Sequence, residues 1–333
     1  MNKKYILSII LTIFVVFSFS KVSFAYEEII PKDLKLSEKS KIFGTTVPST
    51  FAIFSFDPDL IAGWNTPLYD HEKKYLPKKY LDLPVLGGWY GNGVFPNKEV
   101  LLSSKFDAAL VLDVVPAMKK KMEEYMSSIK VPLVVIKNDS LNDDVKMYST
   151  LGKLFNNEKR ANEINTYIQN AINNVENIKK QVKKKVRVYY ADGENGLDTR
   201  CIDSIVFAYG ENVHKCIGKT NKVTFEQLMI YNPDVIIADN ENFFKSLKNN
   251  EKWKRLKAVK NNKVYLIPYE PFSWIRKKTI MEYYVVQYLA DLFYPKYSKI
   301  DLEKELINHL KVFLNYDMTK KEAKRLVNYK GNK

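Results

Sequence analysis

The chain has 333 residues, of which 53 are Lys or Arg and 38 are Asp or Glu, so its formal net charge is +15 at pH 7. This length is sufficient for two domains, each with an ordinary hydrophobic core. The positive balance is compatible with nucleic acid, an anionic membrane or a small anionic ligand as partner. No nucleic-acid recognition motif occurs in the sequence, and the export signal described next also argues against nucleic acid.

The amino terminus has the features of a secretory signal peptide. Lys3 and Lys4 precede an apolar run over residues 5–19, and small residues stand three and one positions before the bond after Ala25. This pattern predicts a signal peptide over 1–25 that is cleaved after Ala25, and the run is short for a membrane anchor. We therefore expect an exported, periplasmic protein, with an uncleaved anchor as the alternative.

The next segment is expected to form an N-terminal α/β lobe over 26–142. Residues 41–46 (KIFGTT) predict a first strand that ends in a Gly-containing turn. Residues 56–97 are rich in Pro, Tyr and Gly, and a loop of this length usually has a function or wraps a surface. A helix is expected over 118–126 and a further strand over 132–136.

Two segments of the chain match each other at a fixed offset of 127 positions. Residues 96–112 read PNKEVLLSSKFDAALVL and residues 223–239 read VTFEQLMIYNPDVIIAD, which pairs Glu99 with Glu226, Leu101 with Leu228 and Asp107 with Asp234. Each copy has a polar cap, a short helix with an acid in its first turn, a turn, and a continuous apolar run. Such runs predict parallel strands buried on both faces. We infer two similar α/β lobes with a cleft between them; chance similarity of two ordinary helix-strand units is the alternative.

The segment between the two copies has helical spacing. Apolar residues recur at helical intervals over 143–185, and the part over 158–184 contains no Gly or Pro. At the rise of an α-helix, that second part would extend roughly 40 Å, about the width of a domain. The pattern predicts one long helix that connects the lobes stiffly. Two ordinary helices inside a single domain are the alternative.

A C-terminal lobe with a helical tail is expected over 186–333. In chain order its elements are a strand over 186–190, a turn-rich loop over 191–204, the second copy of the repeat, a strand over 264–268 and an aromatic loop over 269–276. A capping box at Thr319 to Glu322 predicts the start of the last helix.

The only two cysteines of the chain, Cys201 and Cys216, lie in this second lobe. In an oxidising compartment a single pair is a plausible disulfide, and closing a loop of that size would contribute about 3 kcal/mol in the chain-entropy model. Two free thiols or a role in metal binding are the alternatives.

Motifs of known enzyme classes are absent from the sequence, including GxSxG, Walker, HExxH and dinucleotide-binding patterns. The three histidines, His71, His214 and His309, lie far apart in the sequence. A bare-metal site needs several His or carboxylate ligands that converge. We therefore expect neither a dedicated metal site nor a cofactor of the protein's own. His309 is expected to be structural, and one of the other two histidines could reach a cleft.

Aromatic side chains and arginines are placed where a ligand could meet them. Trp89 and Tyr90 lie in the sequence GGWYG just before the first copy of the repeat. Arg200 follows the first strand of the second lobe, and Trp274 and Arg276 follow its last strand. Loops at the ends of parallel strands are where ligands bind in α/β sheets. A flat or bulky anionic ligand could stack on the tryptophans and pair with the arginines.

The ordered segments resemble those of periplasmic substrate-binding proteins that serve ABC importers of iron-siderophore, haem and cobalamin. The family segment pN-x-E-x-L-L-x-x-x-P-D-x-V corresponds to PNKEVLLSSKFDAALV, and v-s-x-E-x-L-x-x-x-n-P-D-v-I corresponds to VTFEQLMIYNPDVI. The Gly-Gly-x-Asn-Val segment corresponds to residues 209–213, where Tyr209 replaces the first Gly. Phe106-Asp107-Ala108 replaces the usual Pro-Asp-Leu. The match extends from about Lys41 to Tyr294.

The resemblance implies two Rossmann-like lobes with central, mainly parallel sheets, joined by one long α-helix, and a ligand in the cleft between them. It also implies that an acidic residue of each lobe, here Glu99 and Glu226, docks onto the membrane permease. Among ligands a ferric siderophore comes first; haem, with Tyr90 as axial ligand, and a nickel chelate or cobalamin are the alternatives. The protein would be a monomer that carries an iron complex as cargo.

An exported enzyme with an active site in the same cleft is the alternative from another functional class. Asp198, Asp203 and His214 in the second lobe could supply an acid/base pair. Their spacing matches no catalytic motif, and polar residues in loops are more often turn formers.

Overall fold

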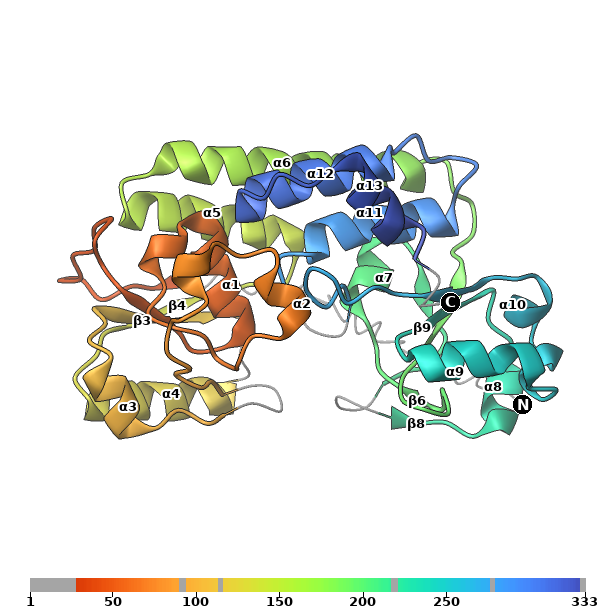
Figure 1. Ribbon diagram of the computed structural model, residues 1–333, viewed down its shortest axis with the longest axis horizontal. Coiled ribbons are helices and arrows are strands. Elements are labelled where there is room, and N and C mark those ends of the chain that lie inside the picture. The colour runs from red at the N-terminus through yellow and green to blue at the C-terminus, as the bar shows by residue number, and fades with distance from the viewer. Residues whose placement is uncertain (1–27, 90–93, 113–115, 217–220, 276–278, 330–333) are drawn as a thin grey trace, which may run out of the picture.

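The structure is a computed structural model that describes residues 28–89, 94–112, 116–216, 221–275 and 279–329. Two α/β lobes lie side by side beneath a layer of long helices that runs across both of them (Figure 1). The expected fold class, two α/β lobes with mainly parallel sheets joined by a long helix, is confirmed. The predicted signal peptide over 1–25 lies outside the described residues.

The first lobe is built on a sheet in the order β1-β4-β3-β2, in which β2, β3 and β4 are parallel and β1 is antiparallel to β4. The strands are β1 (Glu28–Ile29), β2 (Ile42–Gly44), β3 (Ala108–Leu112) and β4 (Leu133–Ile136). The helices are α1 (Val47–Phe56), α2 (Asp70–Lys73), α3 (Lys98–Ser103) and α4 (Pro116–Ser128), with 3-10 turns at Pro58–Leu60 and Lys78–Tyr80. Every residue of β3 is buried, as its apolar run predicts.

The second lobe is built on an all-parallel sheet in the order β10-β9-β5-β7. The strands are β5 (Arg187–Ala191), β7 (Glu211–Asn212), β9 (Val235–Ala238) and β10 (Val264–Leu266), and β6 (Asp198–Thr199) pairs separately with β8 (Asn221–Lys222). The helices are α7 (Asp203–Phe207), α8 (Phe225–Tyr231), α9 (Glu241–Ser246) and α10 (Lys257–Lys260), with 3-10 turns at Leu247–Asn249 and Trp253–Arg255.

Long helices form the layer that both lobes share, along the top of Figure 1. They are α5 (Leu141–Leu154), α6 (Glu158–Lys179), α11 (Glu282–Phe293), α12 (Leu302–Leu314) and α13 (Lys320–Val327). The connector α6 has 22 residues, roughly 33 Å at the usual helical rise. It ends earlier than the sequence suggested, because the amides of Gln181 and Val182 form tight turn hydrogen bonds to Ile178 and Lys179.

The main hydrophobic core is continuous between the lobes. One cluster joins Leu110 of β3, Ile164 and Ile168 of α6, Val188 of β5 and Tyr284 of α11. Each lobe has smaller clusters of its own on the other face of its sheet. Within the described ranges, no helix combines the length and the apolar character needed to cross a bilayer.

The repeat has the same structural meaning in both lobes. The carboxylate of Asp107, just before β3, accepts a hydrogen bond from the amide of Lys41 (2.7 Å). The carboxylate of Asp234, just before β9, accepts one from the amide of Arg187 (3.0 Å). Each aspartate thereby ties the start of its own strand to the start of the neighbouring parallel strand, which explains why both copies retain this residue type.

Candidate functional site

A cavity of about 240 Å³ lies between the two lobes. Its first-lobe side is formed by α1 and the segment that leads into α2. Its second-lobe side is formed by the segment that follows β10. The lining residues are Val47, Thr50, Phe51, Trp64, Asn65, Thr66, Leu68, Tyr69, His71, Glu72, Tyr269, Ser273 and Thr279. The cavity is therefore an interlobe site whose exposed lining is mostly apolar, with hydroxyl, amide, imidazole and carboxylate side chains among the lining residues.

Buried hydrogen bonds hold the first-lobe wall in place. The side-chain amide of Asn65 donates to the carbonyl of Gly44 at the end of β2 (2.7 Å) and to that of Gly87 (2.9 Å). The indole of Trp64 donates to the carbonyl of Tyr80 (2.8 Å). A segment without regular secondary structure is thus anchored to the sheet, and the side chains beyond it are presented from a fixed base.

Tyr69 and His71 form a stacked pair at the start of α2. Their ring centroids are 5.6 Å apart and the ring planes differ by 9°. The Tyr69 side chain is 57% exposed although it is large and aromatic. The carboxylate of Glu72 accepts a hydrogen bond from the amide of Tyr69 (2.9 Å), which fixes the start of the helix. A phenol and an imidazole on one wall of a cleft can stack on a flat ligand or coordinate a metal.

The second-lobe wall is tied to the ends of its strands. The Tyr269 hydroxyl donates to the carbonyl of Asp239, just after β9 (3.0 Å). The Asp239 carboxylate accepts a hydrogen bond from Tyr190 of β5 (2.7 Å). Burial, followed by the adjacent Asp239 charge, raises the pKa of Tyr190 far above its ordinary value, so this phenol stays protonated as a donor. The wall thus lies at the carboxyl edge of the sheet, where α/β proteins bind ligands.

The two tryptophans expected to contact a ligand lie away from the cavity lining, and Trp274 is buried. Trp274 is 1% exposed, its ring lies against Tyr284 and Tyr288, and its indole donates to the carbonyl of Glu270 (2.7 Å). It has no face left for a ligand, and this corrects the expectation. Trp89 is half-buried against Tyr125 and Phe43 of the first lobe and does not line the cavity.

Of the two arginines expected to pair with a ligand, the structure describes only Arg200. Arg200 donates from Nε (2.9 Å) and Nη2 (2.5 Å) to the buried carboxylate of Asp192, and it lies away from the cavity lining. Its charge is thus neutralised within its own loop, which argues against Arg200 as a ligand cation. Tyr90 and Arg276 lie outside the described residues.

The remaining histidines lie apart from the cavity. His214 pairs with the hydroxyl of Tyr231 (3.0 Å) in the second lobe. His309 is buried in α12, and burial lowers its pKa to about 3. Asp198 belongs to β6 and Asp203 begins α7, and neither lines the cavity. Among the described residues, no three His, Cys, Asp or Glu side chains are arranged to hold a metal ion.

Cys201 and Cys216 form a disulfide with a Cα–Cα distance of 5.7 Å.

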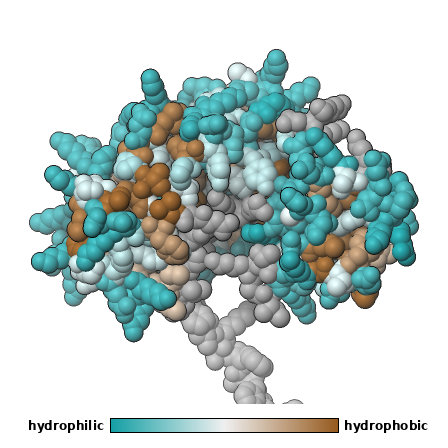
Figure 2. All heavy atoms as spheres, turned by 60° about the horizontal axis from the view of Figure 1, so that its bottom comes forward, coloured by the Kyte–Doolittle hydropathy of each residue, from teal (hydrophilic) through white to brown (hydrophobic). Residues whose placement is uncertain are grey.

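Glu99 and Glu226 occupy equivalent exposed positions in the first turns of α3 and α8. Both helices lie at the lower ends of the lobes in Figure 1. Large apolar side chains are exposed on the same elements, with Phe95 at 73% beside α3 and Ile230 at 80% in α8. Figure 2, with this end turned forward, shows hydrophobic side chains on both lobes among mostly hydrophilic ones. Both lobes thus present an acid together with apolar surface.

The geometry described above agrees with comparisons to known proteins. The family described as "Periplasmic binding protein" matches residues 129–271. The chain is 30% identical over 273 residues to the high-affinity heme uptake system protein IsdE of Staphylococcus aureus (strain Newman), which covers 78% of this chain and 88% of that protein. The chain belongs to the periplasmic binding protein family. It is accordingly a solute-binding protein of the ABC importer class.

Solved structures agree over most of the chain. An ABC transporter solute binding protein from Sulfurospirillum deleyianum has a TM-score of 0.80 and 29% identity, covering 90% of this chain and 95% of that one. The structure of S. aureus IsdE complexed with heme has a TM-score of 0.56 and 28% identity, covering 77% of this chain and 99% of that one. The family's members are solute-binding proteins rather than enzymes.

The sequence indicates that His71 or His214 could reach a cleft, and the structure places His71 in the cavity lining; the sequence does not select the other lining residues. Tyr69 and His71 lie in the long aromatic segment over 56–97, whose length without regular structure was the available signal. Tyr269 begins the second aromatic segment, in which the sequence favours Trp274 and Arg276 as ligand contacts. In that segment, chain position indicates the loop correctly. The structure buries Trp274 and places Tyr269 and Ser273 at the cavity, while Arg276 lies outside the described residues.

Proposed function

We propose that this protein captures an iron complex, with haem favoured, in the interlobe cavity and delivers it to the membrane permease of an ABC importer. The observation that carries the proposal is the stacked pair of the exposed Tyr69 and the half-buried His71 on the wall of a mostly apolar cleft. Apolar lining such as Val47 and Leu68 suits a macrocycle, and an imidazole or a phenolate is a common axial ligand of haem iron.

We rank haem before a ferric siderophore because the apolar part of the lining can cover the faces of a porphyrin. An anionic ferric chelate needs cations in its site, and Arg200 is already paired with Asp192. Arg276 stays a candidate cation, and a siderophore is therefore the second candidate. The relative with 30% identity is named for heme uptake, which supports the same order. The iron complex is cargo rather than a cofactor of the protein.

Titration with haemin, followed by visible absorption, tests the proposal. We expect a saturable Soret band with a stoichiometry of one. His71→Ala should shift or weaken that band if the imidazole coordinates or stacks on the ligand, and Tyr69→Phe should do so if the phenol oxygen coordinates the iron. Tyr90→Phe tests the axial tyrosine that the family resemblance implies. His214→Ala is the matched control, because this histidine lies in the second lobe away from the cavity lining. Absence of any saturable band, with ferric siderophores bound instead, would reject haem.

Delivery is proposed to use Glu99 and Glu226, which occupy equivalent exposed positions on the two lobes. Their other role, stabilising the helix amino termini, is worth only about 0.3 to 1 kcal/mol each. Glu99→Lys combined with Glu226→Lys should leave haemin affinity unchanged and abolish haem uptake by cells. Glu123→Lys combined with Glu251→Lys is the control, since both residues are exposed acids on other elements. Normal uptake by the first pair would remove the docking role.

We also propose that the protein is exported, cleaved after Ala25 and monomeric. A periplasmic protein that is cleaved after Ala25 should yield a mature chain that begins at Tyr26, which intact-mass measurement of the secreted protein would identify. We expect it to be a monomer by light scattering with or without haemin. A mass that includes residues 1–25 would instead indicate an uncleaved anchor.

A further inference from the structure

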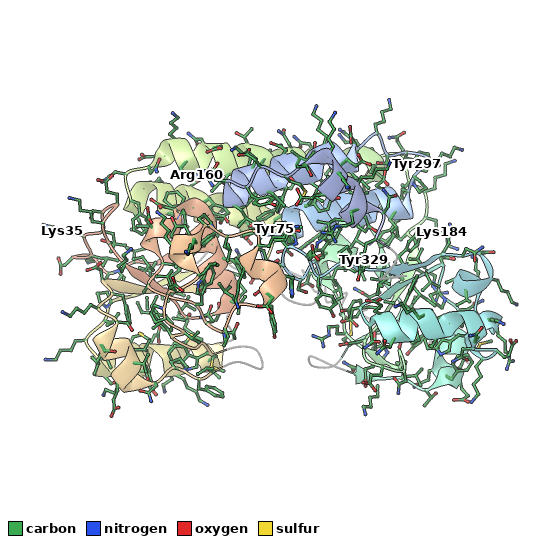
Figure 3. All side chains as sticks on the ribbon, in the orientation of Figure 1. Lys35, Tyr75, Arg160, Lys184, Tyr297 and Tyr329 are labelled. Carbon is green, nitrogen blue, oxygen red and sulfur yellow. A yellow bond between two sulfur atoms is a disulfide. The ribbon has the colours of Figure 1, made fainter. Side chains whose placement is uncertain are left out.

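The C-terminal helix α13 contacts both sides of the cleft. Lys74, which directly follows α2 in the first lobe, forms an ion pair with Glu322 of α13 (3.1 Å). Tyr329, just beyond α13, donates a hydrogen bond to Glu241, the first residue of α9 in the second lobe (3.4 Å). In Figure 3, Tyr75 and Tyr329 lie near the middle of the molecule, below the C-terminal helices. The tail is thus in a position to connect the lobes.

Glu270 lies at the centre of this connection. Its Oε2 atom accepts hydrogen bonds from the Tyr75 hydroxyl of the first lobe (2.9 Å) and from Nη2 of Arg325 in α13 (2.5 Å). Burial alone would raise the pKa of Glu270, but the hydrogen bonds from Arg325 and Tyr75 hold it below its usual value. The carboxylate therefore remains charged at neutral pH and accepts from two different parts of the chain.

The residues of this connection are neighbours, in sequence, of the two cavity walls. Glu270 directly follows Tyr269 of the second-lobe wall. Tyr75 comes four positions after His71 of the first-lobe wall. The same second-lobe segment also places Phe272, which is fully buried, edge-on against Phe51 of α1 (4.7 Å between centroids). A displacement of Glu270 would therefore move one wall relative to the other.

We propose that Glu270 is a positioning residue for the ligand cavity and that α13, through Arg325, holds it so that the spacing between the His71 wall and the Tyr269 wall is fixed before a ligand arrives. The inference rests on the proposed ligand-binding role of the cavity. A site whose walls are already spaced correctly loses less free energy in ordering when the ligand binds. Loss of the Arg325–Glu270 pair should therefore loosen the cleft and weaken ligand binding without unfolding the protein.

Three variants and one control test this role. Arg325→Met and Glu270→Gln each remove the ion pair, and the double variant should bind no more weakly than either single one if both act through the same contact. Lys311→Met is the control, because it breaks the Lys311–Asp317 pair (2.8 Å) of the same tail, which touches neither wall. We expect haemin affinity to fall about tenfold in the variants and to be unchanged in the control.

A second readout is independent of any ligand. Spin labels at Lys121→Cys in α4 and Lys252→Cys in the second lobe report the distance between the lobes by pulsed electron paramagnetic resonance. The native cysteines are both in the disulfide and do not compete for label. The distance distribution of the free protein should broaden in Arg325→Met and stay narrow in Lys311→Met. Tyr75→Phe, which removes a single hydrogen bond, provides a milder variant if Arg325→Met unfolds.

Haemin affinity and the distance between the lobes together distinguish a failure of the positioning role from a failure of the proposed cargo. Unchanged distance distributions and unchanged haemin affinity in all Glu270, Arg325 and Tyr75 variants would overturn the positioning role. If neither the wild type nor any variant binds haemin, the proposed cargo is wrong. In that case a broadened distribution in Arg325→Met still supports the connection between the walls, and a narrow one rejects it.

Discussion

The two lobes share a scaffold and differ in what they attach to it. In both, a capped short helix precedes a fully buried strand, and an aspartate ties that strand to its parallel neighbour. The cavity walls do not repeat. The first lobe contributes Tyr69 and His71 from the segment before α3, whereas the second contributes Tyr269 from the segment after β10. The repeated part therefore determines where the cleft lies, and the unrepeated segments supply its chemistry.

The sharpest difference between the lobes is the disulfide, which joins Cys201 to Cys216 in the second lobe. Replacing both cysteines by Ser should lower the free energy of unfolding by about 3 kcal/mol, because the unfolded chain regains the entropy of a closed loop. Hydrogen exchange should show lost protection around β5 and α7 and little change in β3. Equal loss in both lobes would mean that they unfold as a single unit, as their continuous core would allow.

The helical layer that belongs to both lobes provides the next test. His309 is buried among Tyr167, Tyr284 and Phe313, and burial lowers its pKa to about 3 from an ordinary value of 6.5. The folded state therefore keeps the imidazole neutral while the unfolded chain takes up a proton below pH 6.5. Its contribution is fully present above that pH and is lost as the pH falls towards 3, at about 1.4 kcal/mol per pH unit.

The variant His309→Gln should remove this pH dependence. Between pH 7.5 and pH 5 the wild type should lose about 2 kcal/mol that the variant does not lose, as measured by denaturant titration at each pH. Probes in the first and second lobes should report the same loss, because the layer packs on both sheets. A loss confined to one lobe would show that the layer belongs to that lobe alone.

The paired aspartates test whether the repeat is equivalent in energy as well as in geometry. Asp107→Ala should cost about 1 kcal/mol, the usual value of one lost hydrogen bond. Asp234→Ala should cost more, because Asp234 is less exposed and also pairs with Lys257 (2.6 Å). A double-mutant cycle with Lys257→Met, read by thermal unfolding, would separate the ion pair from the backbone contact. Equal costs at both positions would assign the ion pair no stabilising role.

Most of the scaffold could be predicted from the sequence because its signals are local. The continuous apolar runs of β3 and β9 and the uninterrupted helical spacing of α6 each indicate their own element. Helix α1 gave no such signal, since nearly all its residues are buried and its apolar character has no helical period. An element that is apolar on every side cannot be recognised by periodicity.

The site could be predicted only as far as its loops, because its geometry depends on contacts distant in the sequence. Asn65 donates hydrogen bonds to Gly44 and Gly87, each more than twenty positions away in the sequence. These bonds anchor the segment that continues to the stacked pair of Tyr69 and His71. Trp274 is buried by tyrosines of α11, which come later in the chain. A loop aromatic residue has the same appearance in the sequence whether a ligand or a helix covers it.

The smallest expected effect concerns the wall that only the second lobe provides. Tyr269→Phe removes the hydroxyl that donates to the Asp239 carbonyl but retains the ring beside the cavity. Because one hydrogen bond of this kind contributes about 0.5 to 1.5 kcal/mol, haemin affinity should fall about two- to tenfold while the Soret maximum stays in place. His71→Ala on the first-lobe wall should instead move the maximum. If Tyr269→Phe moved the Soret maximum and His71→Ala did not, the iron ligand would come from the second-lobe wall. The first-lobe wall would then only contact the ligand, which is the reverse of the roles proposed here.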